Sequence, residues 1–285
     1  MKSLVGKRIC LTGGTSGLGL VVANHIIRQG GELFLFLRDE AKLKDINVND
    51  QVHPIICDLS NTKDIENAIN KIKSITNELD VLINNAGLWV FGEKKLTEEG
   101  IELTWQVNVV APFLLIEGLK ELLINGNDAI IINTASALHQ GYINWDDPCF
   151  EKTSFSGFLA YRQSKLAILL LTLHYATELE NSIKVVSNHP GVVSTNLAQS
   201  ANWFIKWFFS LFGKSPNKGA QTIIHLLENS DKAISSTYYV NKKVAKTSTP
   251  ESRSSNSANR LVKLLKSNFE NSYTEINVNI DIKIS

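Results

Sequence analysis

The chain of 285 residues carries 29 lysines and arginines against 28 aspartates and glutamates, so its formal net charge is +1. Such a balance provides no global field that would attract nucleic acid or an anionic membrane, and we expect neither as a partner. Three widely separated cysteines, without a C-x-x-C pair, argue against a disulfide framework and a zinc ribbon. A hydrophobic content of 44% fits a soluble globular protein of one large or two small domains.

The N-terminus reaches only one short apolar run, Ile9–Leu11, before a cluster of glycines. This run is too short for the core of a signal peptide, and no uninterrupted apolar stretch of about 18 residues follows it. We therefore expect a cytoplasmic protein without a transmembrane segment.

Seven short runs rich in β-branched and aromatic residues predict strands. They are Arg8–Thr12, Glu32–Leu37, Val52–Cys57, Val81–Asn84, Ala129–Thr134, Ile183–Ser187 and Thr237–Val240. Segments with helical periodicity lie between most of them, namely Leu18–Gln29, Thr62–Asn77, Glu98–Leu123 and Phe158–Leu179. This alternation predicts an α/β fold of the Rossmann-type, doubly wound kind, with a mostly seven-stranded parallel sheet and helices on both faces.

No low-complexity linker divides the first 240 residues, so we expect residues 1–245 to form a single domain, with an irregularity or kink near Pro112. Residues 246–285 then form a partly flexible C-terminal extension. Within it, Lys246–Asn259 is predicted to be an exposed loop, Leu261–Phe269 a short amphipathic helix, and Glu275–Ser285 either an edge strand or a frayed tail.

The first predicted strand runs directly into the glycine-rich segment Thr12–Gly19, and a helix pattern follows. Glycines at 13, 17 and 19 permit a tight turn and let the backbone approach a pyrophosphate closely. The N-terminus of the following helix would offer free N–H groups and a partial positive charge to the phosphates. Because a strand precedes this turn and a helix follows it, the pattern predicts a dinucleotide site.

The second predicted strand ends at Leu37, and Arg38 and Asp39 follow it about 20 residues after the last glycine of the turn. The guanidinium of Arg38 could bind a ribose 2′-phosphate, as in NADP, through charged hydrogen bonds; a surface salt bridge is the alternative. Asp39 could instead bind the ribose hydroxyls of NAD or simply cap the following helix.

Two further motifs follow in chain order: the segment Asp80–Gly87, which contains Asn84-Asn85-Ala86-Gly87, and the pair Tyr161-x-x-x-Lys165 within a helix pattern. In a chain with six tyrosines the pair alone has little specificity. Together with the glycine turn, the sequence closely resembles the short-chain dehydrogenase/reductase family in its single-domain form. The resemblance extends from about Lys7 to Val240.

The resemblance implies a role for each matching residue. It implies that Asp58 contacts the adenine side of the cofactor, that Asn84 to Gly87 support the central sheet and the cofactor, and that Pro190-Gly191 and Thr195 lie beside the nicotinamide carboxamide. The implied cofactor-binding residues are Gly13, Thr15, Ser16, Gly17, Leu18, Gly19, Arg38, Asp58, Leu59, Asn85, Ala86, Gly87, Tyr161, Lys165, Pro190, Gly191, Val193 and Thr195. The implied catalytic tetrad is Asn108, Ser136, Tyr161 and Lys165.

The resemblance also bears on cofactor choice. By alignment on the glycine turn, Leu37 occupies the position that is acidic in NAD-preferring members, and Arg38 occupies the next position, which is basic in many NADP-preferring members. Their second basic position, inside the turn, is Ser16 here. One basic residue rather than two therefore supports a preference for NADP(H), and NAD(H) stays possible.

The chemistry of the tetrad can be argued from the side chains. Hydride transfer to a carbonyl leaves an alkoxide that needs a proton, and a tyrosine with an ordinary pKa of about 10 ionises too weakly to act reversibly at neutral pH. Lys165, one helical turn after Tyr161, can lower that pKa by its positive charge. Ser136 should hydrogen-bond the substrate oxygen, and Asn108 should hold a water that passes the proton onward from Lys165.

Each of these residues also has a structural interpretation: Tyr161 and Lys165 as a pair on a helix surface, Ser136 as a strand-end cap, and Asn108 as a satisfied polar group near Pro112. Their order and context together favour catalysis.

The scattered histidines lack metal-ligand spacing, so no metal site is predicted. For His139, a role in a loop is favoured over contact with the substrate.

Twenty-five positions separate Ser136 from Tyr161, and the intervening insert, around Gly141–Ser156, resembles that of retinol-dehydrogenase-like and WW-domain-oxidoreductase-like members. Three further segments share this resemblance: Tyr161-Arg-Gln-Ser-Lys165-Leu-Ala, Asn188-His-Pro-Gly191-Val-Val and Gly219-Ala-Gln-Thr222. Within the catalytic domain, family members place a mobile substrate lid in the region that corresponds to residues 192–216.

The most apolar stretch of the chain, Trp203–Phe212, falls within that region. Three roles are open for it: a lid over a lipophilic substrate, a core or dimer-contact helix, or a peripheral contact with a membrane surface, the least favoured of the three. The working hypothesis is NADP(H)-dependent interconversion of a small lipophilic or aromatic aldehyde or ketone and its alcohol. Retinoid-like compounds enter only by family analogy.

Two alternative functions stay open at this stage: an NADP-binding sensor or scaffold without turnover, and a reductase of carbon–carbon double bonds. The intact tetrad disfavours the first. We also expect a homodimer or homotetramer through the segments Glu98–Leu123 and Phe158–Leu179, because both look too apolar to face water.

Overall fold

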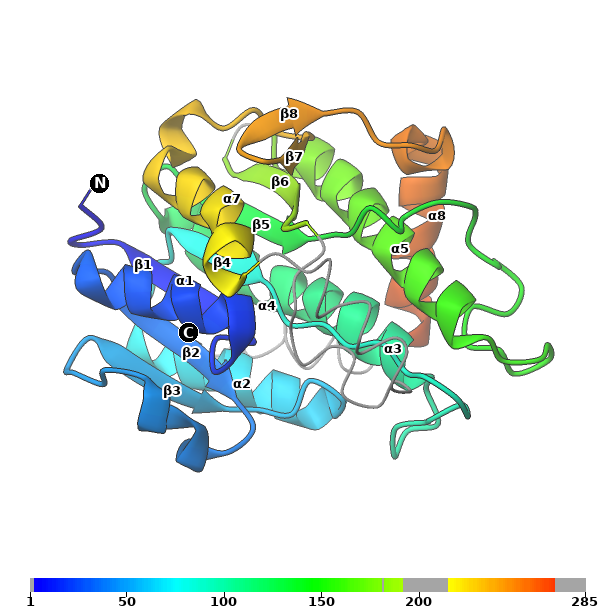
Figure 1. Ribbon diagram of the computed structural model, residues 1–285, viewed down its shortest axis with the longest axis horizontal. Helices are drawn as coiled ribbons and strands as arrows, with labels where there is room; N and C mark the ends of the chain where they lie inside the picture. Colours follow the sequence, from blue (N-terminus) through cyan, green and yellow to red (C-terminus); the bar gives the residue numbers. More distant parts are fainter. Residues whose placement is uncertain (1–2, 181, 192–214, 270–285) are drawn as a thin grey trace, which may run out of the picture.

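The computed structural model describes residues 3–180, 182–191 and 215–269, and its centre is one eight-stranded sheet (Figure 1). The strand order is β3-β2-β1-β4-β5-β6-β7-β8. All seven predicted strands are present and pair in parallel: β1 (Arg8–Thr12), β2 (Glu32–Leu37), β3 (Val52–Ile56), β4 (Val81–Asn84), β5 (Ile130–Thr134), β6 (Lys184–His189) and β7 (Tyr238–Val240). The doubly wound Rossmann-type prediction is therefore confirmed.

The eighth strand was not predicted. β8 (Lys243–Ala245) pairs antiparallel with β7 through a two-residue turn, Asn241-Lys242, in which both residues have positive φ angles of 50° and 67°. A turn of this length and handedness is typical of tight hairpins. The strand has only three residues and lies at the sheet edge, so its sequence carries too little periodicity to reveal it.

Helices cover both faces of the sheet, as predicted. α1 (Gly17–Arg28) and α7 (Pro216–Glu228) pack against each other on one face, while α2 (Thr62–Ile75), α4 (Ala111–Asn125) and α5 (Gly157–Glu178) cover the other (Figure 1). The shorter helical segments are η1 (Glu40–Asp45), α3 (Leu103–Trp105), η2 (Gln106–Val110), η4 (Ser230–Lys232) and η5 (Glu251–Arg253).

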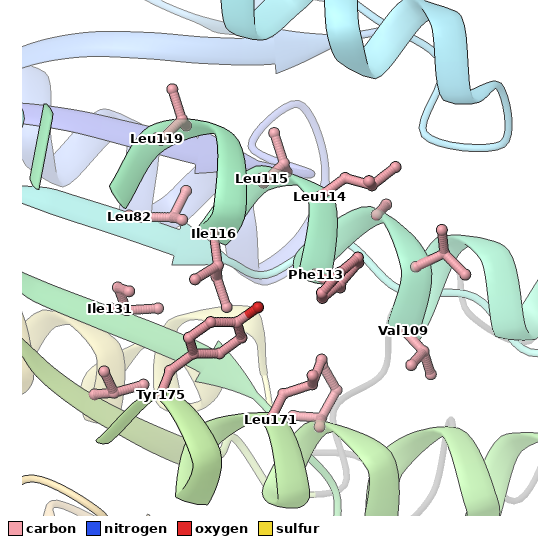
Figure 2. Packing of buried hydrophobic residues seen from close by; sticks show 14 of the residues in the cluster. Leu82, Val109, Phe113, Leu114, Leu115, Ile116, Leu119, Ile131, Leu171 and Tyr175 are labelled. Atoms are coloured by element: carbon pink, nitrogen blue, oxygen red, sulfur yellow. The ribbon is translucent and has the colours of Figure 1, made fainter. Parts of the chain in front are cut away.

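The strands supply two separate cores because successive side chains point to opposite faces. In β1, Ile9 and Leu11 join the core under α1 and α7, whereas Cys10 joins the core on the face covered by α2, α4 and α5. Figure 2 shows the second core, where Leu82 of β4 and Ile131 of β5 lie beneath side chains of α4 and α5. Because both faces of the sheet are buried, the sequences of the central strands are continuous apolar runs, and such runs are easy to recognise as strands.

The predicted helix Glu98–Leu123 is wrong at its start. Residues 98–102 are not helical, and a β-bridge joins Leu96 to Glu102. The buried carboxylate of Glu102 accepts hydrogen bonds from the amides of Thr104 and Trp105 at 2.9 and 2.8 Å, so it caps the helix and fixes its first turn.

The helical path then widens into the π-helical segment η2, directly before Pro112 in the first turn of α4. Proline has no N–H to donate to the carbonyl four residues earlier, that of Asn108, so the irregularity predicted near Pro112 has a direct physical cause. As a consequence, Asn108 lies on the irregular turn.

The C-terminal extension is more ordered than predicted as far as the structure describes it. Lys246–Asn259 is not one exposed loop, because η5 begins at Glu251 and helix α8 (Ser255–Asn268) begins six residues before the predicted start at Leu261. The side chain of Ser254 accepts a hydrogen bond from the amide of Ser257 and caps α8. The predicted edge strand Glu275–Ser285 lies outside the described residues.

Helix α8 packs along α5 and joins the second core (Figure 1). Its buried residues are Ala258, Leu261, Val262 and Leu265. Part of the apolar surface of α5 is therefore covered within the chain, which weakens the reason for expecting a subunit contact there. The homodimer or homotetramer stays a prediction.

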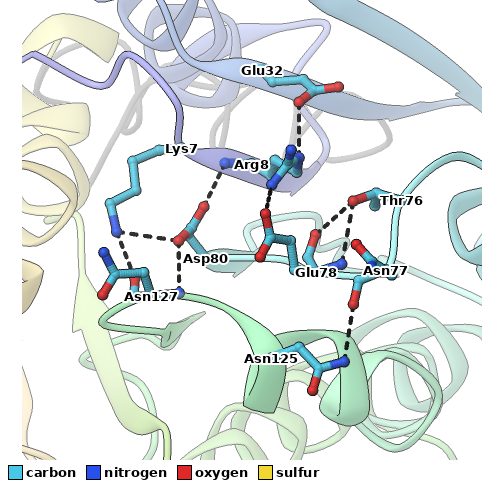
Figure 3. Close-up of polar contacts among 9 residues, drawn as sticks. All are labelled: Lys7, Arg8, Glu32, Thr76, Asn77, Glu78, Asp80, Asn125 and Asn127. Carbon is cyan, nitrogen blue, oxygen red and sulfur yellow. Dashed lines mark hydrogen bonds and ion pairs between the residues drawn. The ribbon is translucent and has the colours of Figure 1, made fainter.

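The amino ends of the central strands are held by charged residues (Figure 3). The Asp80 carboxylate accepts hydrogen bonds from the Arg8 amide at 2.8 Å, the Asn127 amide at 3.0 Å and the Lys7 ammonium at 3.2 Å. Arg8 also forms ion pairs with Glu32 and Glu78. Asp80 thus ties β1, β4 and the approach to β5 together at the edge opposite the carboxyl ends of the strands, where the predicted site residues lie.

Candidate active site

The carboxyl ends of β1 and β4 meet at the point where the strand order reverses, which is where open α/β sheets bind their ligands. The glycine turn follows β1 there. Gly13 has a φ of 66°, and a Cβ atom on it would lie 2.9 Å from the Cα of Ala86. A Cβ atom on Gly19 would overlap the carbonyl oxygen of Gly13. Only glycine fits at these two positions.

Thr12 and Asn85 lock this turn against the segment after β4. The Thr12 hydroxyl accepts hydrogen bonds from the amides of Asn85 and Ala86, both at 3.0 Å. In return, Nδ2 of Asn85 donates to the carbonyls of Thr12 and Gly13 at 3.0 and 3.2 Å. Sequence reasoning did not assign a role to Thr12; its position at the end of the first strand was the available signal.

Helix α1 begins at Gly17 with an uncapped N-terminus. Ser16 holds the cap position with extended backbone angles but makes no side-chain capping bond, and the first turn has no acidic residue. The first N–H groups of the helix are thus available to an anion, with the helix dipole in their favour. Together with the glycine turn, this arrangement fits the pyrophosphate of a dinucleotide.

The predicted ribose and adenine contacts follow β2 and β3. Arg38 is exposed and forms no hydrogen bond or ion pair with the residues that the structure describes, so the alternative of a surface salt bridge finds no support there. Asp39 caps η1, because its carboxylate accepts a hydrogen bond from the Ala41 amide at 2.9 Å. Asp58, next to Leu59, accepts hydrogen bonds from the amide and hydroxyl of Ser60 at 2.9 and 2.8 Å.

A buried polar chain connects the central strands to α5. Nδ2 of Asn84 donates to Oδ1 of Asn133 at 2.8 Å, and Nδ2 of Asn133 donates to the hydroxyl of Thr172 at 3.1 Å. All three side chains are buried. Such a chain fixes the spacing between the sheet and the helix that carries Tyr161 and Lys165.

Tyr161 and Lys165 lie one turn apart on α5, and both are almost fully buried, with 8% and 4% of their surface exposed. The Lys165 ammonium lies 5.7 Å from the centre of the Tyr161 ring and donates a hydrogen bond to the carbonyl of Thr134 at 3.0 Å. Burial lowers the pKa of Lys165 to about 8. Burial also raises the pKa of Tyr161 to about 12, and a hydrogen bond with Ser136 opposes this rise.

The expected lowering of the tyrosine pKa is therefore not seen in the protein alone. Desolvation outweighs the hydrogen bond with Ser136, and the Lys165 ammonium is engaged with Thr134. A phenol with this raised pKa is fully protonated at neutral pH, which suits it to donate a proton.

Ser136 follows β5 and is buried beside Tyr161. Its hydroxyl oxygen accepts a hydrogen bond from the Leu138 amide at 3.1 Å. The structure thus brings Ser136, Tyr161 and Lys165 together, as their predicted roles require.

Asn108 lies on the π-helical turn, and its side chain forms hydrogen bonds with the backbone of the residue that follows Gly87. Its Oδ1 accepts from the Leu88 amide and its Nδ2 donates to the Leu88 carbonyl, both at 2.9 Å, while Nδ2 also donates to the hydroxyl of Ser164 at 3.0 Å. A Cβ atom on Gly87 would lie 3.3 Å from both Oδ1 of Asn108 and Nζ of Lys165. Asn108 therefore lies in the site, and its role in holding a water stays a prediction.

His139 is more than a residue of a surface loop. It is buried, its Nδ1 lies 2.6 Å from the carbonyl oxygen of Ser136, and its Nε2 accepts a hydrogen bond from the Ser248 amide at 3.0 Å. Since an amide can only donate and a carbonyl can only accept, the ring is neutral with its proton on Nδ1. Burial accordingly lowers the pKa of His139.

An aromatic stack adjoins Tyr161, and sequence reasoning did not find it. The ring of Trp89 lies parallel to the Tyr161 ring at 4.5 Å and stacks on Phe91 at 4.6 Å. Phe158, one turn before Tyr161 on α5, lies 6.1 Å from Trp89 and is 46% exposed. The signal in the sequence was a run of large apolar residues, Trp89–Phe91, directly after the Asn84–Gly87 segment.

Pro190 and Gly191 follow β6 at the carboxyl edge of the sheet, with Gly191 at a φ of 90°. Val193, Thr195 and the predicted lid with its stretch Trp203–Phe212 lie outside the described residues.

Within the described part of the chain, no group of three or more histidine, cysteine, aspartate or glutamate side chains could hold a metal ion. None of the described helices is long and apolar enough to cross a membrane.

Comparison with known proteins agrees with this geometry. The family described as short chain dehydrogenase matches residues 7–204. Retinol dehydrogenase 11 of Homo sapiens is 36% identical over 233 residues, covering 78% of this chain and 73% of its own length. Polyprenol dehydrogenase of Homo sapiens is 32% identical over 238 residues, covering 75% of this chain and 70% of its own length.

Solved structures share the fold. A protein from Mycobacterium paratuberculosis superposes with a TM-score of 0.74 at 23% identity, over 94% of this chain and 96% of its own. Carbonyl reductase from chicken fatty liver, solved with bound NADPH, superposes with a TM-score of 0.64 at 20% identity, over 85% of this chain and 99% of its own. The chain belongs to the short-chain dehydrogenase/reductase family, resembles the retinol dehydrogenases within it, and is an oxidoreductase that acts on CH–OH or C=O groups.

Proposed function

We propose that this oxidoreductase uses NADP(H) to interconvert a lipophilic or aromatic aldehyde or ketone and its alcohol. The observation that carries the proposal is the buried group of Ser136, Tyr161 and Lys165 at the carboxyl ends of the strands. A protonated phenol, a hydroxyl and a cation converge there, and together they can bind a carbonyl oxygen and protonate it.

The residues at the end of β1 would hold the cofactor. Gly13 and Gly19 permit the tight turn that would approach the pyrophosphate, the N–H groups of α1 would bind its oxygens, and Arg38 would bind a 2′-phosphate. A nicotinamide cofactor bound there would supply or accept the hydride. Asp58, Asn85 and Gly191 would complete the site along the same edge of the sheet.

In the direction of reduction, the hydroxyls of Ser136 and Tyr161 would bind the carbonyl oxygen, and Tyr161 would donate its proton as negative charge develops on that oxygen. Lys165 would stabilise the phenolate that is left. In the direction of oxidation, Tyr161 would take the proton of the alcohol. Asn108 would hold the water that returns a proton to the pair.

Two observations support a lipophilic substrate. Trp89 stacks on Tyr161, and Phe91 and Phe158 contact Trp89, so a cluster of aromatic rings lies beside Tyr161. The names of two relatives specify retinol and polyprenol, both of which are lipophilic alcohols.

The test of turnover is NADPH oxidation in the presence of all-trans-retinal, cinnamaldehyde and decanal. We expect turnover by the parent protein and a loss of about 10²–10⁴-fold in Tyr161→Phe, because the proton donor is removed. Tyr142→Phe is the matched control, since Tyr142 is 76% exposed. If no carbonyl is consumed, or if Tyr161→Phe matches the parent, the proposal is wrong.

The cofactor preference is tested by thermal unfolding with NADP or NAD at equal concentrations. We expect the larger stabilisation with NADP, and we expect Arg38→Ala to weaken NADP binding about tenfold or more while leaving NAD binding unchanged, because a charged hydrogen bond to the 2′-phosphate is lost. Lys71→Ala on α2 removes an equal, exposed charge elsewhere and should have no effect. Equal stabilisation of the parent by both cofactors would contradict the preference.

A further inference from the structure

We propose that Trp89 is a positioning residue for Tyr161, whose ring it holds in place by stacking while it disfavours the ionised form of the phenol. This inference rests on the proposed role of Tyr161 as the general acid and base. It adds a residue that neither the motifs of the sequence nor the roles implied by the family resemblance contain.

The geometry of the contact is specific. The two ring planes differ by 7° and their centres lie 4.5 Å apart, which is within the range of stacked aromatic pairs. Phe91 stacks on Trp89 at 4.6 Å with planes 24° apart, so the three rings form one continuous stack with Tyr161 at its inner end. The indole therefore restricts rotation of the Tyr161 ring and keeps its hydroxyl next to Ser136.

The stack is separate from the two hydrophobic cores. Trp89, Phe91 and Phe158 belong to neither cluster of buried apolar residues, and all three retain some exposure. The indole Nε1 of Trp89 is buried and has no hydrogen-bond partner among the residues that the structure describes. A buried donor without a partner costs free energy, so packing stability alone does not explain the indole at this position.

The stack also acts on the charge of Tyr161. The face of an aromatic ring carries partial negative charge, so a parallel indole opposes the development of negative charge on the phenol beneath it. The indole also excludes water from that side of the ring, which disfavours the phenolate further. Lys165 and Ser136 act in the opposite direction: the ammonium lies 5.7 Å from the same ring centre, and the hydroxyl forms a hydrogen bond with the phenol.

Among the described residues, Tyr238 on β7 is a further ionisable group that interacts with Tyr161. Its burial, and to a smaller extent its electrostatic interaction with Tyr161, raise the pKa of Tyr238, so it stays neutral at the pH of the assay. His139 packs edge-on against Tyr238 and is also neutral. Burial, to which the stacked Trp89 contributes, therefore opposes Ser136 and Lys165 at Tyr161, and the result favours the protonated phenol that carbonyl reduction needs.

The test is the pH dependence of cinnamyl alcohol oxidation with NADP, which requires ionised Tyr161, compared in the parent, Trp89→Ala and Trp89→Phe. We expect Trp89→Ala to shift the rise in rate to lower pH by about one unit. We also expect its kcat for cinnamaldehyde reduction to fall by about tenfold with little change in KM, because the orientation of the proton donor is lost. Trp89→Phe should restore the pH profile of the parent because it retains a stacked ring.

Trp145→Ala is the matched control. Trp145 is also half-buried, but it lies under Arg260, whose guanidinium is 4.7 Å from the centre of the indole ring. Its replacement by alanine should therefore leave the pH profile unchanged. If Trp89→Ala unfolds, Trp89→Leu serves the same comparison. If cinnamyl alcohol is not turned over, ¹³C NMR of ζ-labelled tyrosines reports the same ionisation, with Tyr161→Phe assigning the resonance.

The outcomes are distinguishable. A pH profile or tyrosine titration of Trp89→Ala that overlays that of the parent overturns the inference, provided that Tyr161→Phe is inactive. An active Tyr161→Phe overturns the proposed function instead. A downward shift that Trp89→Phe reverses and Trp145→Ala lacks supports the positioning role.

Discussion

The side chain of Lys165 is 4% exposed and carries its charge into the interior of the protein. Within the described part of the chain it forms one hydrogen bond, to the carbonyl of Thr134, and burial lowers its pKa from 10.5 to about 8. A shift of this size corresponds to a penalty of about 3 kcal/mol on the charged form relative to the neutral form. The group that we propose to stabilise the Tyr161 phenolate therefore destabilises the fold at neutral pH.

We predict that Lys165→Met raises the free energy of unfolding at pH 7 by about 1–3 kcal/mol while the rate of carbonyl reduction falls by about 10²–10⁴-fold. The gain is less than the full penalty because the Thr134 carbonyl loses its donor. Thermal unfolding at pH 7 measures the first effect and NADPH oxidation the second. A lower unfolding temperature for Lys165→Met, with exposed Lys42→Met unchanged, would show that the buried charge is not destabilising.

The same pKa predicts a pH dependence. Between about pH 8 and 10.5 the unfolded chain binds more protons at Lys165 than the folded chain, so the stability of the parent gains from this group as pH rises through that window. Lys165→Met should lack this gain, and the two unfolding curves should converge toward alkaline pH. In the parent, reduction should also slow above about pH 8, because a neutral Lys165 no longer stabilises the phenolate.

At the scale of single residues, the sequence predicted those whose motif is local in the chain. Tyr161 and Lys165 are one helical turn apart, and the glycines follow the first strand directly, so the two motifs taken together could be recognised from the sequence and carried the family resemblance. Thr12 and Trp89 act across long distances in sequence, on residues 85–86 and 161, and only the folded chain brings those partners together.

At the scale of elements, helices α4 and α5 are joined by a buried carboxylate. Glu117 on α4 accepts a hydrogen bond from the Tyr175 hydroxyl of α5 at 2.6 Å and pairs with Lys120 at 2.8 Å. The Lys266 ammonium of α8 lies 3.6 Å from Oε1 of Glu117, so a third helix contacts the same carboxylate. Figure 2 shows the Tyr175 hydroxyl directed toward α4 among apolar side chains, where water cannot replace a lost donor.

We predict that Tyr175→Phe lowers the free energy of unfolding by about 1–3 kcal/mol, because a buried carboxylate loses one of its donors. Urea unfolding measures this, with Tyr142→Phe as the control on an exposed tyrosine. A change below about 0.5 kcal/mol in Tyr175→Phe would mean that the two lysines alone satisfy Glu117.

Elements were predicted well where their apolar pattern is long and continuous, as in the parallel strands and in α5. The errors arose where a tertiary contact overrides the local pattern. The carboxylate of Glu102 caps the helix so that it begins at residue 103 rather than at 98. Helix α8 begins earlier than predicted because a serine cap and the surface of α5 stabilise a polar first turn.

At the scale of the whole molecule, each of two distant positions contains a neutral buried histidine. His25 of α1 faces Glu228 of α7 on one side of the sheet, at 3.4 Å, and His139 links the loop after β5 to Ser248. Burial lowers the pKa of both rings from 6.5, and the nearby Glu228 only partly offsets this for His25. Protonation of either ring would therefore strain a contact between separate parts of the fold.

Because both pKa values are lower in the folded chain, the unfolded chain binds protons first as pH falls through 6.5, and the folded state loses stability. We predict a loss of up to about 1 kcal/mol for each histidine between pH 6.5 and 5.5. Thermal unfolding across pH 5–8 measures it. His139→Gln should be less stable than the parent at pH 8, where the ring contacts are intact, and the two curves should approach one another toward pH 5. Parallel curves over the whole range would show that His139 does not contribute to the acid sensitivity of the fold.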